Sequence, residues 1–268
     1  MSATFKIINI IKQSLSGSAQ IPDPVAVEEP LEIKIAHGQS SATLSTISIT
    51  MRTPVADHAL AIGFLFTEGI IKNKLDVTGF DQQGNVITLF LKEELIIDLP
   101  SVTRNFYTTS SCGVCGKASI EAIQVESQVN KNSFVVSHSV IHSLPVKLIP
   151  AQENFRFTGG LHASALFDVE GNLLLLQEDV GRHNALDKAI GSVLLSGQYA
   201  FEKMILLVSG RASFELVQKA AVAGIPIVAA IGAPSSLAVE LAEEKGISLL
   251  GFLKSDRFNI YSHPNRIR

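Results

Sequence analysis

The second half of the sequence alternates short apolar runs with helix-like segments, and this rhythm limits the possible folds more than any other feature. Apolar runs at 161–168 and 173–177, separated by Val169-Glu170-Gly171-Asn172, predict a β-hairpin. Helices are expected at 144–155, 182–195, 213–223 and 235–245, and further strands at 204–208, 227–231 and 247–252. This order predicts an α/β layered sheet, in which ligands bind where strand ends meet helix starts.

The first half follows a different pattern and is expected to be an α+β, strand-rich region. Apolar and polar residues alternate at 31–35, 47–51, 86–91 and 106–108. Thr53-Pro54 predicts a helix start and Gly69 predicts its end. Residues 1–30 contain one glycine and three prolines as breakers and are interpreted as a loosely attached extension. The predicted parts are an extension at 1–30, a strand-rich domain at 31–135 and an α/β domain at 136–268.

Composition excludes several classes of function. The 268 residues, 46% of them hydrophobic, can bury a substantial core. The net charge of −3 argues against a general nucleic-acid-binding surface. No apolar run approaches the roughly 18 residues that span a membrane, and the start of the chain lacks the pattern of a secretory signal. With only two cysteines, a disulfide-stapled secreted protein is a poor explanation, so a cytosolic protein is expected.

Those two cysteines lie in one loop-like motif, Ser110-Ser111-Cys112-Gly113-Val114-Cys115-Gly116-Lys117. Its glycines and serines give the backbone freedom to move. Lys117 and the N-terminus of an expected helix that follows it favour the thiolate, which is the form that attacks sulfur. The motif is therefore a candidate site for covalent sulfur chemistry.

The thiol pair could also belong to a structural zinc site or to a dithiol oxidoreductase. A structural zinc site needs four ligands, but there is no third cysteine, and His138/His142 is the only histidine pair at a suitable spacing, so no protein-bound metal is expected. A dithiol oxidoreductase is the stronger alternative. Such motifs usually follow the first strand of a thioredoxin-like unit, whereas here the α/β half lies downstream. Redox activity of the loop itself stays open.

Together with the thiol motif, several blocks resemble the FdhD family of formate dehydrogenase accessory proteins. They are Arg52-Thr53-Pro54, Gly63-Phe64-Leu65-Phe66-Thr67-Glu68-Gly69, Thr158-Gly159-Gly160-Leu161-His162, Glu178-Asp179-Val180-Gly181-Arg182-His183-Asn184-Ala185-Leu186-Asp187-Lys188, Ser209-Gly210-Arg211-Ala212-Ser213 and Ala233-Pro234-Ser235-Ser236-Leu237-Ala238. The resemblance extends from about residue 30 to residue 262. Val55-Ala56-Asp57-His58 departs from the family pattern, which affects only the local helix start.

The resemblance implies a sulfur carrier. Such a protein accepts persulfide sulfur from a cysteine desulfurase and passes it to a molybdenum or tungsten bis-guanine-dinucleotide cofactor, the acceptor substrate, before that cofactor enters formate dehydrogenase. Cys112 would carry the persulfide, and Cys115 would resolve or steady it. The resemblance also implies contact between the cofactor and a segment comprising Phe252, Leu253, Lys254, Ser255, Asp256 and Arg257. From the residues alone, this segment is better explained as a solvated turn.

The resemblance further implies a cytidine-deaminase-like second half, but the residues argue against deamination. Zinc deaminases need H-x-E at one helix start and P-C-x-x-C at the next. Here the first position reads His183-Asn184-Ala185, and the second, Ser209-Gly210-Arg211-Ala212-Ser213, has no thiol. These helix starts suit anion capture instead, which makes Arg182, His183, Ser209 and Arg211 candidate ligands of a nucleotide phosphate.

Each of these residues can also be explained without a ligand. A single arginine is more often a surface ion-pair partner or a helix cap than a ligand, and His183 would equally fit as a core histidine. Glu178 and Asp179 are interpreted as caps or ion-pair partners, because sulfur exchange needs no strong carboxylate base.

The sequence thus predicts a sulfurtransferase with a mobile thiol loop over a nucleotide-binding crevice. The alternatives are a dithiol redox protein and a non-catalytic chaperone that docks the cofactor. The expected partners are the desulfurase, formate dehydrogenase and the cofactor, with no nucleic acid and no membrane, and a homodimer is left open.

Overall fold

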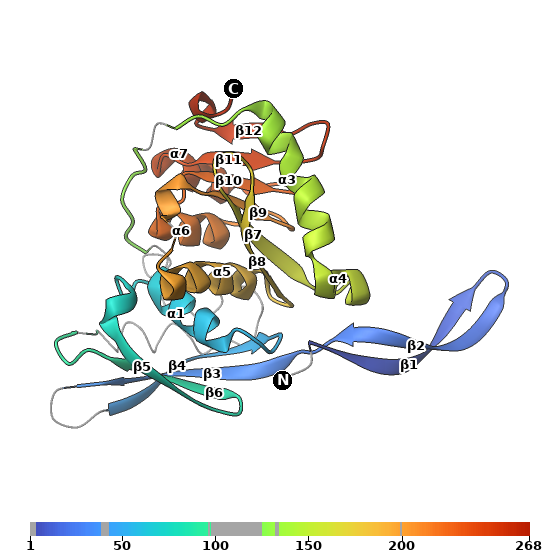
Figure 1. Cartoon of the computed structure of the whole chain (residues 1–268), viewed down its shortest axis with the longest axis horizontal. Coiled ribbons are helices and arrows are strands. Elements are labelled where there is room, and N and C mark those ends of the chain that lie inside the picture. Colours follow the sequence, from blue (N-terminus) through green and yellow to red (C-terminus); the bar gives the residue numbers. More distant parts are fainter. Residues whose placement is uncertain (1–3, 39–42, 96, 98–124, 132–133, 199) are drawn as a thin grey trace.

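In the computed structural model, the described residues form three β-sheets (Figure 1). The structure describes every residue except 1–3, 39–42, 96, 98–124, 132–133 and 199. The predicted strand at 106–108 and the whole thiol motif therefore lie outside the described residues. None of the described helices is long and apolar enough to cross a membrane.

The largest sheet has six strands in the order β12-β11-β10-β9-β7-β8. These are β7 (His162–Phe167), β8 (Leu173–Asp179), β9 (Ile205–Val208), β10 (Ile227–Ala230), β11 (Ser248–Gly251) and β12 (Asn259–Ser262). Strands β9, β10 and β11 are parallel, while β7 and β8 form the predicted antiparallel hairpin. The prediction of an α/β protein is confirmed.

Helices cover both faces of this sheet, as period-2 burial requires. Leu206 and Val208 of β9 pack with α5 (Arg182–Ser196), α6 (Phe214–Ala223) and α7 (Ser236–Glu244). Ile205 and Leu207, on the opposite face, pack with α3 (His138–Ala151). Sheet strands buried on both faces explain the continuous apolar runs in this half of the sequence.

The helix expected at 144–155 is wrong in both of its limits. Helix α3 begins six residues earlier, at His138, because the Ser137 side chain caps it by accepting from the backbone N–H of Val140. It ends at Ala151, and a separate short helix, α4 (Glu153–Thr158), follows. Pro145 falls in the first turn of the expected helix, where proline is tolerated, but in the middle of α3.

The first half forms a four-stranded sheet in the order β4-β3-β6-β5, with α1 (Asp57–Thr67) packed on one face. Its strands are β3 (Glu29–His37), β4 (Thr43–Arg52), β5 (Val77–Gln83) and β6 (Val86–Leu91). Strand β5 was not predicted. The described residues also form short 3-10 helices, η1 (Lys74–Asp76), η3 (Phe201–Lys203) and η4 (Pro264–Arg266).

The predicted start of α1 at Thr53-Pro54 is also wrong. Val55 and Ala56 have left-handed backbone angles, with φ of 89° and 61°, so the helix begins at Asp57. A buried ion pair fixes this turn, because Arg52 Nε and Nη2 donate to the two carboxylate oxygens of Asp57 at 2.8 and 2.9 Å.

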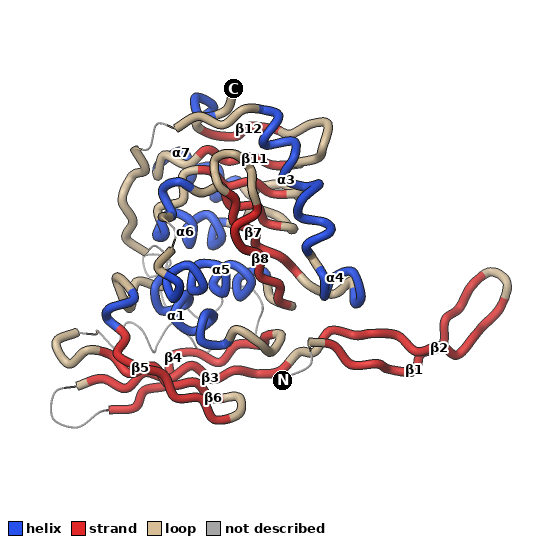
Figure 2. The backbone as a smooth tube through the Cα atoms, viewed as in Figure 1, coloured by secondary structure: helices blue, strands red, loops and turns tan. Residues whose placement is uncertain are grey.

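The N-terminal extension is an ordered hairpin and not an irregular segment. Strands β1 (Phe5–Ser14) and β2 (Gly17–Ala26) pair antiparallel over their whole length and project from the body as an arm (Figures 1 and 2). The prolines that argued against strands here, Pro22 and Pro24, lie within β2. An outer strand tolerates proline wherever the missing N–H would point away from its partner. The predicted domain limits near residues 30 and 135 stay a prediction.

The two halves meet where α1 crosses α5 at glycine positions. A Cβ added to Gly63 would lie 1.9 Å from the carbonyl oxygen of Asp187, and one added to Gly191 would lie 1.9 Å from that of Ala59. The two helix backbones are therefore in direct contact, and only glycine fits at either position.

Gly63→Ala is expected to destabilise the protein by about 3 kcal/mol or more, because the methyl group would overlap backbone that cannot move aside. Urea unfolding measures this loss. Gly160→Ala is the control, since its Cβ would lie 3.8 Å from the Ala26 side chain, an ordinary contact, and the change should stay within about 0.5 kcal/mol. Equal unfolding midpoints for the two variants would contradict this account of the helix crossing.

Candidate functional site

The candidate site lies along the edge of the six-stranded sheet where β8, β9, β10 and β11 end. Because β7 runs in the opposite direction to β9, His162 at the start of β7 reaches the same edge. Backbone hydrogen bonds connect the loops that leave this edge. The N–H of Gly232 donates to the oxygen of Gly210 at 2.9 Å, and the N–H of Phe252 donates to that of Gly232 at 3.0 Å. The structure thus brings the loops of the predicted residues together.

Among the described residues, three helices begin at this edge, and two of them lack a hydrogen bond from the N-cap side chain. Helix α5 starts after Gly181 and helix α6 after Ser213, and neither of these N-cap residues accepts from the helix with its side chain. Helix α7 differs, because the Ser235 side chain accepts from the N–H of Ala238. The two uncapped starts are those next to Arg182 and Arg211. Free N–H groups and the positive end of the helix dipole favour an anion at both.

Titratable side chains surround the start of α5. His183 Nε2 lies 3.8 Å from Glu215 Oε2, and the structure gives this buried nitrogen no hydrogen-bond partner among the described residues. The His183 side chain, against an opposing effect of partial burial, lowers the pKa of Glu215 to about 2. Burial lowers the pKa of His162, and the nearby Arg182 lowers it further. The start of α5 thus has the guanidinium of Arg182 beside a His162 held towards its neutral form, while Glu215 keeps a negative charge at the start of α6.

A buried carboxylate, Asp179, fixes the turn into α5. Its Oδ1 accepts from the N–H of Gly181 at 2.8 Å and from the side-chain amide of Asn184 at 3.1 Å. Its Oδ2 lies 2.7 Å from Lys188 Nζ and accepts from the N–H of Thr53 at 3.1 Å. Asp179 has no exposed surface, so it acts as a structural anchor and not as an acid or base.

The neighbouring Glu178 has a similar structural role. Its carboxylate accepts from the N–H groups of Asn154 and Phe155 at 3.0 and 2.8 Å, where α4 begins. The prediction that Glu178 and Asp179 are caps or ion-pair partners is confirmed.

The other predicted ligand residues differ in how exposed their side chains are and in whether those side chains already have a hydrogen-bond partner. The Ser209 hydroxyl oxygen already accepts from the N–H of Ala163 at 2.8 Å. Arg211 is exposed. Leu253 is buried in the core, so only its backbone could reach a ligand. Phe252 is 46% exposed and has a left-handed φ of 52°, and strained backbone of this kind is often found at ligand sites.

Residues 254–257 form a tight exposed turn after β11. The N–H of Lys254 donates to the oxygen of Arg257 at 2.8 Å, and Asp256 lies 3.7 Å from the Arg257 guanidinium in solvent. A salt bridge at such exposure contributes little. The turn is thus shaped by its own backbone.

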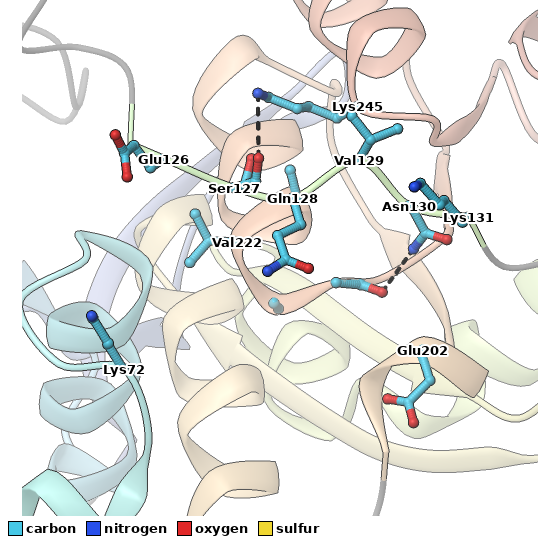
Figure 3. Close-up of a pocket in the computed structure, with 13 residues that line it drawn as sticks. Lys72, Glu126, Ser127, Gln128, Val129, Asn130, Lys131, Glu202, Val222 and Lys245 are labelled. Atoms are coloured by element: carbon cyan, nitrogen blue, oxygen red, sulfur yellow. Dashed lines mark hydrogen bonds between the residues drawn. The ribbon is translucent and has the colours of Figure 1, made fainter.

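A separate hollow of about 900 Å³ lies at the opposite edge of the sheet (Figure 3). It is lined by Lys72, residues 126–131, Glu202, residues 221–224 and Lys245. Lys245 donates to the oxygen of Ser127, and Asn130 donates to that of Gly224, which holds the 126–131 segment in place. Because α6 and α7 end here, their negative dipole ends oppose the attraction of Lys72, Lys131 and Lys245 for a phosphate. The hollow has no described helix start to supply free N–H groups, as the other edge does.

The predicted catalytic residues Cys112 and Cys115 lie outside the described residues. Within the described part of the chain, no group of three histidine, cysteine, aspartate or glutamate side chains could hold a metal ion. At the position where a deaminase would need its glutamate stands Ala185, and the preceding Asn184 is occupied by Asp179 and the oxygen of Met51.

Sequence reasoning missed His162 and Glu215 as residues of this edge. His162 stands in one of the family-like blocks, which was the available signal. Glu215 is the second residue of α6, and no sequence signal pairs it with His183, which lies 32 positions earlier.

The chain is similar in sequence and fold to known proteins. The model of the FdhD/NarQ family matches residues 26–268. A protein of Mycolicibacterium paratuberculosis is 48% identical, with 92% of each chain covered, and one of Picrophilus torridus is 46% identical, with 92% of this chain and 93% of the relative covered; both are named sulfur carrier protein FdhD. A solved structure from Desulfotalea psychrophila, assigned by its description to the formate dehydrogenase accessory proteins, has a TM-score of 0.78 at 24% identity, covering 99% of this chain and 100% of that one.

Glu215→Gln is expected to remove a pH-dependent part of the stability. The pKa of Glu215 in the folded protein is about 2, below its ordinary 4.5, so its contribution is present above pH 4.5 and is lost as the pH falls towards 2. At most roughly 3 kcal/mol follows from such a shift. Urea unfolding between these pH values tests it, with the exposed Glu240→Gln as control. An unchanged pH dependence in Glu215→Gln would contradict the His183–Glu215 pairing.

Proposed function

The chain belongs to the FdhD/NarQ family, and from that membership we propose that it is a sulfurtransferase that loads sulfur onto a molybdenum or tungsten bis-guanine-dinucleotide cofactor. The donor is the persulfide of a cysteine desulfurase, and the cofactor then serves formate dehydrogenase. The names of the curated relatives support sulfur transfer. We place the reaction in the cytosol, where the two thiols would stay reduced.

Thiol chemistry supports Cys112 as the carrier. Its thiolate attacks the outer sulfur of the desulfurase persulfide, so that a new sulfur–sulfur bond forms on Cys112 while the old one breaks. The electron pair of the broken bond leaves with the desulfurase cysteine as a thiolate. In the transfer to the cofactor the sulfur–sulfur bond on Cys112 would break, Cys112 would leave as a thiolate with the electron pair, and the acceptor metal would supply the two electrons that reduce the transferred sulfur to sulfide. Cys115, three residues away, is suited to steady the loaded form.

The proposal that the chain binds the cofactor rests on one observation. The starts of α5 and α6, beside Arg182 and Arg211, have no N-cap side-chain hydrogen bond. A guanine dinucleotide has a pyrophosphate, and backbone N–H groups with a guanidinium fork are the donors that suit it. The exposed ring of Phe252 and the backbone of the 252–257 segment lie on the same edge, within reach of a base or sugar. His162 and His183 add donors to this edge.

A dithiol redox protein and a docking chaperone are the alternatives. The redox protein would need both cysteines but no nucleotide site, whereas the chaperone would need the site but neither cysteine. The uncapped helix starts favour a protein that handles a phosphate-bearing ligand, and the relatives' names favour sulfur transfer over docking alone.

Cys112→Ala is expected to abolish sulfur loading, because among the remaining residues only Cys115 could hold a persulfide. Mass spectrometry after incubation with a desulfurase and cysteine detects the bound sulfur. Cys115→Ser is the matched control and should still be loaded. An undiminished sulfur adduct on the Cys112→Ala protein would show that Cys112 is not the carrier.

Arg211→Ala is expected to weaken GDP binding by about 1.5–3 kcal/mol, the usual contribution of a hydrogen bond to a charged group. An arginine that forms only a surface ion pair would change it by less than about 1 kcal/mol. Calorimetric titration distinguishes the two. Arg156→Ala is the control, because Arg156 is an exposed arginine on α4. If the wild-type protein gives no heat with GDP, or if Arg211→Ala binds unchanged, this edge is not the nucleotide site.

A further inference from the structure

Helix α3 holds the exposed turn between β11 and β12 from both of its sides (Figure 1). Before the turn, the buried side chain of Leu253 belongs to the core cluster that contains the buried side chains of α3. After the turn, the ring of Phe258 packs against the rings of His138 and His142, with centroid distances of 5.7 and 4.9 Å. Residues 254–257 are therefore anchored to α3 at both ends.

One further contact with α3 comes from a histidine side chain. His142 Nδ1 lies 3.3 Å from the carbonyl oxygen of Lys254. Because a carbonyl oxygen only accepts hydrogen bonds, Nδ1 carries the proton and is the donor. The N–H of the same Lys254 donates to the oxygen of Arg257 at 2.8 Å. Both backbone groups of Lys254 are thus occupied, the N–H within the turn and the carbonyl oxygen by α3.

The tip of the turn offers donors to a ligand. The N–H groups of Ser255, Asp256 and Arg257 have no hydrogen-bond partner among the described backbone groups. The side chains of Lys254 and Arg257 are exposed beside them. Consecutive free N–H groups next to cationic side chains suit the oxygen atoms of an anionic nucleotide. Several donors can bind one ligand together only while the backbone that carries them keeps one shape.

The interactions within the turn are too weak to keep that shape by themselves. The backbone bond from Lys254 to Arg257 shapes the turn, but it is exposed and has no second backbone bond beside it within residues 254–257. The ion pair of Asp256 with Arg257 has an N–O distance of 3.7 Å and is more than 60% exposed, so it contributes little. Exposed backbone with few hydrogen bonds opens readily. A contact from outside the turn is what keeps it closed.

We propose that His142 is a positioning residue for the nucleotide. Its hydrogen bond to Lys254 fixes the 254–257 turn before the ligand arrives, so that binding does not have to order the turn. This inference rests on the proposed function, in which the 252–257 segment contacts the cofactor. His142 acts through the backbone of Lys254 and does not contact the cofactor itself.

His138 offers a comparison within the same helix. It lies four residues before His142, and its ring packs on the same Phe258. Among the described side chains, that of His142 is the one that donates to the turn. A role in packing alone would therefore be shared by the two histidines, whereas a role through Lys254 belongs to His142.

Calorimetric titration of the full chain with GDP tests the proposal. His142→Ala is expected to weaken binding about three- to tenfold, the range that one neutral hydrogen bond supplies. His142→Asn should restore binding to within about twofold of the wild type, because the amide nitrogen of asparagine can take the place of Nδ1. His138→Ala is the matched control, which removes ring packing alone, and it should also bind within about twofold of the wild type.

Hydrogen exchange of the free protein, followed by NMR, separates positioning from a general loss of structure. The amide of Lys254 should exchange faster in His142→Ala than in the wild type, since its bond within the turn depends on the shape of the turn. The amides of Phe252 and Leu253, which donate to the neighbouring loop and strand, should exchange at unchanged rates.

Four results would overturn the positioning role and leave the nucleotide site in place. They are wild-type affinity for GDP in His142→Ala, an equal loss of affinity in His138→Ala, a His142→Asn protein that binds as weakly as His142→Ala, and unchanged exchange at Lys254. Wild-type protein that gives no heat with GDP would overturn the nucleotide site, and the positioning role with it.

Discussion

The buried contact of Asp179 with Lys188 and Thr53 is the interaction on which the arrangement of the site depends. Lys188 Nζ donates at 2.7 Å to the carbonyl oxygen of Thr53 and lies 2.7 Å from the Asp179 carboxylate, with both charged side chains almost fully buried. Burying two charges is costly unless their hydrogen bonds are complete. Here the Asp179 oxygens are further occupied by N–H groups of Thr53 and Gly181. The turn that begins α5 is thereby fixed in one geometry.

The same contact makes the two halves of the chain one structure. Thr53 directly follows β4, and Asp179 is the last residue of β8. Their hydrogen bond therefore connects the four-stranded sheet to the six-stranded one. A second buried network repeats the arrangement, because Lys219 Nζ donates to Thr67 and to Asp187 at 2.8 and 3.0 Å. The close packing of Gly63 against α5 lies between the two networks. A helix start held this firmly can present Arg182 and His183 to a ligand at little further ordering cost.

The sequence predicted those parts that depend on local periodicity. Each strand of the six-stranded sheet except β12, and α5, α6 and α7, were expected near their observed positions, because apolar spacing and glycine stops are local signals. Helix α3 was misplaced because Pro145, which would suit the first turn of a helix, lies in its middle, and the arm was missed because Pro22 and Pro24 are tolerated in a strand only where no N–H is needed. The link from Thr53 to Asp179 spans 126 positions, and no local signal could have predicted it. Arg182 and Arg211 were predicted as ligands, but only the folded edge shows that their helix starts are the uncapped ones.

The proposed site of the nucleotide part of the cofactor is this edge of the sheet. Hydrogen exchange of the wild-type protein with and without GDP tests this placement. Slower exchange is expected in the first turns of α5 and α6, around residues 182–184 and 214–216, and in the loop at 252–257. Slower exchange confined to the opposite hollow, at residues 126–131 and 221–224, would contradict it.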